Sequence, residues 1–179
     1  MFSGGGAIEV MYAYTGPAEL TALAHPESGG ACINTPSDME SWASAQSPED
    51  LAAPFTYVVD RQTRLRLAPR RSEHVVCASG EPVLGAGEIT FDRDAGRWTV
   101  AEITNLSTGY CPDVTSWDAV ARSLERAGLG HPGGFTHEVV FRRCVACREV
   151  NVVREGDFVC VFCDAPLPRE WNAGPVTPS

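Results

Sequence analysis

Two pairs of cysteines near the C-terminus have the residue types and spacing to bind a metal ion. Cys144 and Cys147 form one C-x-x-C pair, and Cys160 and Cys163 form a second pair after 12 intervening residues. A two-residue spacer lets one tight turn present two sulfur atoms to one ion, and four thiolates at about 2.3 Å suit tetrahedral zinc. One pair alone would fit a redox motif equally well, whereas two pairs at this spacing are typical of a zinc site. The sequence therefore predicts that these four cysteines bind zinc.

The arrangement of the two pairs resembles a zinc ribbon, in which each pair lies on its own tight turn. Segment 149–160 predicts a hairpin between the pairs, with its turn at residues 154–157. Arg148 and Asp164 stand where zinc ribbons usually carry a glycine after the second cysteine of each pair. Four thiolates leave no open coordination position, so we expect a structural zinc ion that holds residues 140–165 together.

Cys111 is a second candidate for chemistry, because it lies in a polar, glycine-containing loop between a predicted strand and a predicted helix. The dipole of a nearby helix N-terminus would favour a thiolate there, and the thiolate is the nucleophilic form of cysteine. A small buried packing residue is the other common role of a single cysteine. The sequence leaves both possibilities open.

The order of elements around Cys111 resembles that of the ubiquitin-conjugating enzymes. Here an antiparallel meander at about residues 55–104 precedes the loop with the cysteine, and Trp117 and a helix follow it. The His-Pro-Asn tripeptide of that family is absent upstream of the cysteine, and Asn105 is the asparagine placed to stabilise an oxyanion. The resemblance implies that Cys111 would carry a ubiquitin-like protein as a thioester and pass it to a lysine.

The rest of the sequence predicts the elements that must position these residues. Thr35 and Ser47 each cap a predicted short helix, because a proline follows and an acid lies three residues on. Thr115 and Asp118 form a predicted capping box for the clearest helix, which we expect to end at Gly128. These helices and a series of short strands predict an α+β fold with an antiparallel β-meander and the C-terminal ribbon. The predicted strands are residues 7–14, 55–59, 65–67, 74–78, 83–91, 97–104 and 135–141.

We expect three parts along the chain. Residues 1–134 would form an α+β body that begins with a flexible lead at residues 1–6. Residues 135–168 would form the zinc ribbon packed on that body, and residues 169–179 would form a tail. The glycine-rich residues 130–134 would link the body to the ribbon.

The charge of the chain argues against nucleic acid as a partner. Its formal net charge is −9, and four zinc-bound thiolates with one zinc ion would take that charge to about −11. Proteins that bind nucleic acid gain much of their affinity from basic surfaces that neutralise phosphates. The expected partner is therefore another protein with a basic surface.

Composition also bears on the compartment. No apolar run approaches the ~18 residues that a transmembrane helix needs, and residues 1–6 lack the basic flank and apolar stretch of a signal peptide. Thiolates that are available for zinc suit a reducing compartment. We therefore expect a cytoplasmic protein that does not enter the membrane.

Together these observations favour an intracellular protein-interaction or adaptor protein, because no complete catalytic constellation is visible and a four-thiolate zinc is usually structural. The alternative is a cysteine-dependent transferase with Cys111 as the nucleophile and Asn105 at the oxyanion. The two hypotheses differ in the reactivity that they require of the Cys111 thiol.

Overall fold

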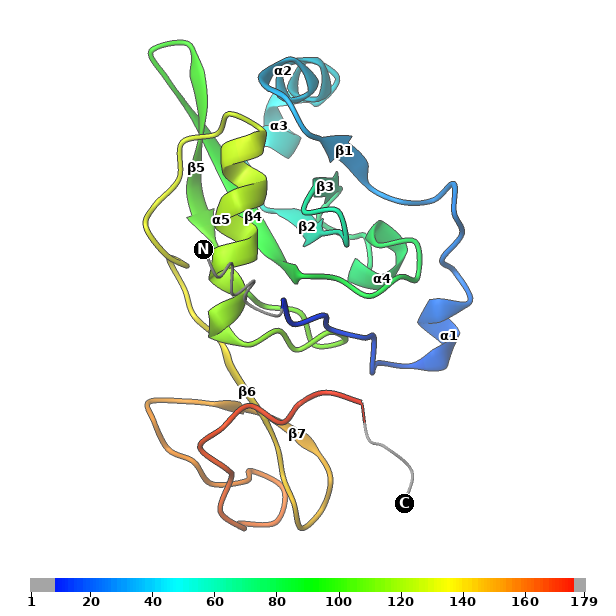
Figure 1. Cartoon of the computed structure of the whole chain (residues 1–179), viewed down its shortest axis with the longest axis vertical. Helices are drawn as coiled ribbons and strands as arrows, with labels where there is room; N and C mark the ends of the chain where they lie inside the picture. Colours follow the sequence, from blue (N-terminus) through cyan, green and yellow to red (C-terminus); the bar gives the residue numbers. More distant parts are fainter. Residues whose placement is uncertain (1–8, 176–179) are drawn as a thin grey trace, which may run out of the picture.

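A five-stranded antiparallel sheet organises the larger part of the chain, which confirms the predicted α+β class (Figure 1). The structure is a computed structural model that describes residues 9–175, so the predicted flexible lead at residues 1–6 and the last residues of the predicted tail lie outside the described residues. The strand order is β1-β3-β2-β4-β5, because β4 returns beside β2 and not beside β3. The strands are β1 (Ala31–Ile33), β2 (Phe55–Val59), β3 (Leu65–Ala68), β4 (Gly85–Asp94) and β5 (Arg97–Ile103).

Short α-helices accompany this sheet. Thr35 and Ser47 cap two of them as predicted, since each hydroxyl accepts a hydrogen bond from the backbone N–H three residues on. No helix within residues 9–175 is long and apolar enough to cross a membrane. The α-helices are α1 (Ala18–Thr21), α2 (Pro36–Ser44), α3 (Pro48–Leu51), α4 (His74–Cys77) and α5 (Trp117–Arg126).

The predicted strand at residues 74–78 is wrong, because this segment forms the helix α4. Val75 and Cys77 of this helix are buried against one face of the sheet. A short apolar run cannot be assigned to strand or helix from its own pattern. Here the chain must cross from the end of β3 back to the start of β4 beside β2, and one helical turn on the sheet face makes that crossing.

The predicted capping box between Thr115 and Asp118 at the start of α5 is also wrong, because other residues occupy the cap and bond to Thr115. Ser116 is the N-cap residue, and the Thr115 hydroxyl donates to the carboxylate of Asp113 at 2.8 Å instead. A short 3-10 turn at Val114–Ser116 leads into the helix. The predicted end at Gly128 is confirmed, since its φ of +70° is the left-handed conformation that glycine adopts freely.

Both faces of the sheet are covered. Successive residues of a strand point to opposite faces, so the sheet contributes to two hydrophobic clusters. On one face Tyr57 and Leu65 pack with Val120 and Leu124 of α5, which crosses the sheet in Figure 1. On the other face the next residue of β2, Val58, packs with α4 and with Tyr12 and Tyr110. This sandwiching leaves β2 buried along its whole length.

The C-terminal part of the chain forms a separate two-stranded sheet of β6 (Val140–Arg143) and β7 (Val150–Val153). The predicted hairpin within segment 149–160 is confirmed at its turn, where Arg154 and Asp157 form an isolated antiparallel bridge. Its predicted strand pairing is wrong, because β7 pairs with β6. We refer to residues 140–167 as the cysteine unit. It lies at the lower end of Figure 1.

Residues beyond the cysteine unit return to the main body. The side chain of Asn172 brackets the backbone of Arg143, accepting from its N–H at 2.7 Å and donating to its carbonyl oxygen at 2.8 Å. Ala173 is fully buried, and the ring of Trp171 meets that of Tyr12 edge-on at 5.3 Å. The first residues of the predicted tail are therefore packed. The proposed division of the chain into body, ribbon and tail stays a prediction.

Candidate metal centre

The two C-x-x-C pairs lie on turns of the same construction. After the first pair, the Arg148 N–H donates to the Cys144 carbonyl at 3.0 Å, and the Cys144 N–H donates to the Glu149 carbonyl at 2.9 Å. The second pair repeats both bonds in Asp164, Cys160 and Ala165, at 3.0 and 2.8 Å. Each C-x-x-C pair therefore lies in its own hydrogen-bonded turn that reverses the chain direction. Because the first turn reverses the chain directly after β6, the residues that follow it pair with β6 and not with the segment before the second pair.

Arg148 and Asp164 adopt the left-handed backbone conformation, with φ values of +71° and +61°. Glycine is usual at such positions because a Cβ atom makes this conformation unfavourable by roughly 1–2 kcal/mol. The two turns thus keep the geometry of a glycine-containing turn without the glycine. Asp164 tolerates it better than Arg148, since aspartate populates this region more readily than other side chains.

The four sulfur atoms have the spacing of a tetrahedral metal site. The Sγ atoms of Cys144, Cys147, Cys160 and Cys163 all lie within 4.8 Å of one another. Two of these distances, Cys144–Cys163 and Cys147–Cys160, are 3.6 Å. A tetrahedral ion with metal–sulfur bonds of about 2.3 Å places its ligands ~3.8 Å apart, whereas a disulfide needs about 2.05 Å. The cluster therefore fits a metal ion and not a pair of disulfides.

Asn151 supports this cluster from β7, and its role was not recognised from the sequence. Its amide nitrogen lies 3.5 Å from the Sγ of Cys160 as a donor, and its Oδ1 accepts from the Val161 N–H at 2.9 Å. Burial raises the pKa of Cys160, but the hydrogen bonds from the Phe162 N–H and the Asn151 amide outweigh it and hold the pKa of this thiol below its usual value. A polar residue between valines in a short strand was the only sequence signal.

Cys111 lies apart from these sulfurs in a buried part of the main body. Its thiol is inaccessible and donates to the Thr108 carbonyl at 3.1 Å. Burial raises the pKa of Cys111 to about 11, against a smaller lowering by the Arg143 charge. The thiol is therefore protonated at neutral pH. The catalytic role of Cys111 stays a prediction, and its surroundings do not favour it.

Asn105 is fully buried and holds two backbone segments together. Its amide nitrogen donates to the carbonyl oxygens of Pro112 and Val139 at 3.0 and 2.8 Å, and its Oδ1 accepts from the Val139 N–H at 2.7 Å. Both amide hydrogens are thus engaged by backbone carbonyls. The structure gives Asn105 the role of a clamp between the Cys111 loop and the segment that leads into β6, and its oxyanion role stays a prediction.

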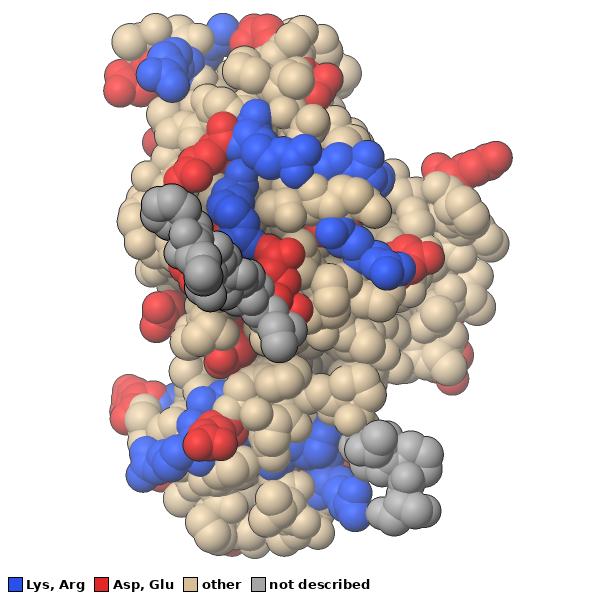
Figure 2. All heavy atoms as spheres, in the orientation of Figure 1, with Lys and Arg blue, Asp and Glu red and all other residues tan. Residues whose placement is uncertain are grey.

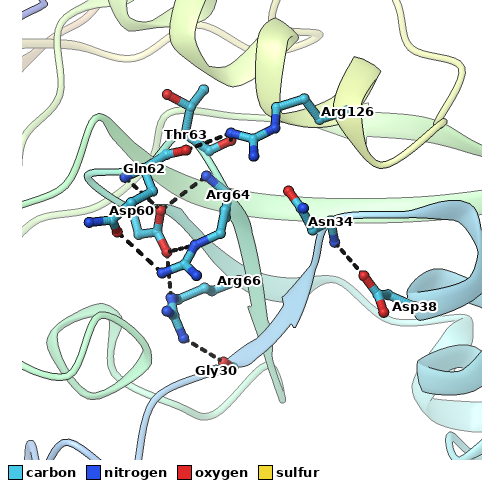
Figure 3. Close-up of polar contacts among 9 residues, drawn as sticks. All are labelled: Gly30, Asn34, Asp38, Asp60, Gln62, Thr63, Arg64, Arg66 and Arg126. Carbon is cyan, nitrogen blue, oxygen red and sulfur yellow. Dashed lines mark hydrogen bonds and ion pairs between the residues drawn. The ribbon is translucent and has the colours of Figure 1, made fainter.

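Asp60 organises a second polar cluster, at the turn between β2 and β3 (Figure 3). Its carboxylate accepts from the backbone N–H groups of Gln62 and Arg64 and from the Nε–H groups of Arg64 and Arg66, all at 2.9–3.0 Å. Arg126 of α5 donates to the Gln62 carbonyl at 2.6 Å. Burial raises the pKa of Asp60, but these hydrogen bonds and charges outweigh it and hold the pKa below its usual value. These arginines bind the protein's own turn, so the cluster is structural.

Comparison with known proteins returns no relative for this chain. No protein-family model, no curated protein and no solved structure matches it. The resemblances to zinc ribbons and to ubiquitin-conjugating enzymes therefore rest on the residues alone, and the functional argument rests on the geometry described above.

Proposed function

We propose that this chain is a protein-interaction or adaptor protein whose cysteine unit is held in shape by one structural zinc ion. The observation that carries the metal proposal is the closed cluster of four sulfurs within 4.8 Å. A tetrahedral set of four thiolates suits zinc or iron and leaves no position for a substrate. The ion would then stabilise the fold, because the cysteine unit has too few residues to build a sufficient core of its own.

The distribution of exposed apolar side chains supports the interaction role. Eight large hydrophobic side chains are exposed in the described part of the chain, and five of them lie between Val145 and Phe162. Apolar surface that gathers on one small unit is typical of a surface that binds another macromolecule. The buried, protonated thiol of Cys111 supports this proposal over a thioester-forming transferase. A reducing cytoplasm would keep the four thiolates available, and we include that location in the proposal.

Metal analysis of the purified protein tests the first half of the proposal. We expect one zinc ion per chain, and less than a tenth of that in a variant with Cys144→Ser and Cys163→Ser. In cobalt-substituted protein the thiolate charge-transfer and tetrahedral d–d bands should not change when azide or cyanide is added. A shift of these bands would reveal an open coordination position and would contradict a purely structural site.

A thioester assay tests the second half. Incubation with activated ubiquitin-like proteins should give no Cys111-linked, thiol-sensitive adduct, because the thiol is buried and protonated. An adduct that forms with the native protein and disappears in Cys111→Ala would replace the adaptor proposal with the transferase alternative.

A further inference from the structure

Residues 168–174 follow the cysteine unit, and two consecutive arginines of β6 bind them to it. We call these residues the strap, and they lie at the red, C-terminal end of the described chain in Figure 1. Arg142 donates to two consecutive carbonyl oxygens of the strap at 3.1 and 2.7 Å. Arg143 donates to the Gly174 carbonyl at 3.2 Å, and the Asn172 side chain brackets its backbone. The strap is thus joined to the two residues that directly precede the first cysteine of the cluster.

The side chain of Arg169 adds a second kind of contact between the strap and the unit. Its guanidinium lies over the Phe158 ring at 4.1 Å from the ring centroid, and that of Arg142 lies at 5.7 Å from the same ring. Basic and acidic side chains are intermixed at the lower end of the face drawn in Figure 2, where the unit lies, so this face has no single sign of charge to attract the strap. Specific hydrogen bonds and this stacking therefore fix its position.

The same strap is bound to the main body through Trp171. The indole N–H donates to the Cys111 carbonyl at 2.9 Å, and the ring meets the Tyr12 ring edge-on at 5.3 Å. Trp171 also packs against two hydrophobic clusters of the body, one that includes Cys111 and one that includes Tyr12. Both residues lie outside the cysteine unit, so the strap has one set of contacts with the unit and another with the body.

The cysteine unit has little apolar core apart from its own cysteines. Its hydrophobic cluster has three buried members among the described residues, Cys144, Cys160 and Leu167. Two of these three belong to the set that we propose binds the metal. Without the metal–sulfur bonds so small a unit lacks a sufficient core, and we expect it to lose its order. The arginines that hold the strap would lose their positions with it.

We infer that the strap couples the metal centre to the body, as a metal-dependent latch. The strap stays docked on Cys111 and Tyr12 while the cysteine cluster is metal-bound, and it is released when the metal is lost. Release uncovers the apolar surface that Trp171 occupies on the body. This inference rests on the structural metal site of the proposed function and adds to it a conformational switch.

Coupling of this kind acts in both directions. If the metal favours docking of the strap, weaker docking must weaken metal binding by the same factor. Trp171→Ala tests this from the body side, because it removes the contacts with Cys111 and Tyr12 and leaves the four cysteines and the two arginines of β6 unchanged. Its dissociation constant for zinc, measured by competition with a zinc-sensitive dye, should rise at least about fivefold, the lower end of the usual range for coupled sites.

Two further variants control this measurement. Glu170→Ala changes the neighbouring residue of the strap, whose side chain is exposed, and its zinc affinity should stay within twofold of the native value. Trp171→Phe keeps an aromatic ring and removes only the indole donor, so its affinity should lie between those of Trp171→Ala and the native chain. It supplies the test if Trp171→Ala does not fold.

Hydrogen exchange in the native chain tests the coupling from the metal side. The indole N–H of Trp171, assigned by its absence in Trp171→Phe, should exchange at least tenfold faster after chelation. The internal control is the indole N–H of Trp98, which donates to Glu40 at 3.1 Å in the body and should change less than twofold.

The outcomes separate the latch from the proposed function. Equal exchange of the Trp171 indole with and without metal, or equal zinc affinity in Trp171→Ala and the native chain, would overturn the latch while the structural metal site stands. Equally accelerated exchange of the Trp98 indole would show that the metal holds the whole chain together, and would also overturn a local latch. A native chain that binds no zinc would overturn both proposals.

Discussion

The indole N–H of Trp171 donates a hydrogen bond to the carbonyl oxygen of Cys111 at 2.9 Å. This bond joins the segment that follows the cysteine unit to the loop that was predicted to carry chemistry. Trp171 lies eight residues after Cys163, so its position depends on the fold of the unit before it. We therefore expect the burial of Cys111 to depend on the order of the four-cysteine cluster, and this dependence can be measured.

Metal removal should expose Cys111. In metal-loaded protein at pH 7 we expect iodoacetamide to alkylate Cys111 more than 100-fold slower than free cysteine, because a pKa of about 11 leaves very little thiolate. Chelation should raise this rate at least tenfold by releasing Trp171. Cys77, which is buried under the main sheet, is the internal control and should stay protected. Rapid alkylation of Cys111 in the metal-loaded form would return the transferase alternative to consideration.

Asn151→Ala should weaken metal binding by about 10- to 100-fold, the usual effect of losing a group that orients a metal ligand. The change removes the hydrogen bond to the Cys160 sulfur and the acceptor of the Val161 N–H. Competition with a zinc-sensitive dye measures the affinity. Val152→Ala, on the same strand and exposed, should leave it within threefold. Equal affinities in the two variants would show that Asn151 does not support the site.

Arg148→Gly should stabilise the metal-loaded protein by about 1 kcal/mol, because glycine removes the unfavourable left-handed conformation of a side chain with a Cβ atom. Asp164→Gly should give a smaller gain, since aspartate tolerates this conformation. Thermal unfolding reports both changes as a higher Tm. Glu149→Gly is the control, because its φ is not positive and glycine should lower the Tm there. A lower Tm in Arg148→Gly would mean that the Arg148 side chain stabilises the protein by more than its left-handed backbone conformation destabilises it.

Asn105→Ala should destabilise the protein by about 3 kcal/mol, because it removes three hydrogen bonds and leaves buried backbone groups without partners. Urea unfolding of metal-loaded protein measures the loss. Asn34→Ala is the comparison, since the Oδ1 atom of Asn34 has no hydrogen-bond partner within residues 9–175, and it should cost less than 1 kcal/mol. A loss below 1 kcal/mol in Asn105→Ala would remove the clamp role.

Stability should fall with pH below about 6.5 partly through His74. Burial lowers the pKa of His74, although its hydrogen bond to the Gly87 carbonyl at 2.9 Å and the charges of Glu88 and Glu73 act in the opposite direction. Below its unfolded pKa of about 6.5 the unfolded chain binds a proton more readily than the folded chain, so the stability present at higher pH is lost. The metal thiolates also bind protons in acid, so acid lowers stability in the native protein for two reasons. Comparison with a His74→Gln variant isolates the contribution of His74. The native protein should lose more stability than this variant between pH 7 and 5.5, and parallel curves would contradict the assignment.

Local sequence determined the cluster of four cysteines and several helix boundaries. The spacing within each C-x-x-C pair constrains two sulfurs to one turn, and the structure brings both turns together within 4.8 Å. The caps at Thr35 and Ser47 and the stop at Gly128 also depend on atoms only a few residues apart. Such features are encoded by covalent geometry and short-range hydrogen bonds, so they can be recognised without knowledge of the fold.

The tertiary structure alone decided the surroundings of Cys111 and Asn105, the helical state of residues 74–77 and the pairing of β7 with β6. The surroundings of Cys111 and Asn105 depend on partners far away in the sequence: Trp171 reaches Cys111, and Val139 reaches Asn105. A thiol in a polar loop has the same sequence signature whether it is exposed or buried. Its pKa and its access to solvent are set by the segments that pack over it, and those are fixed only when the whole chain has folded.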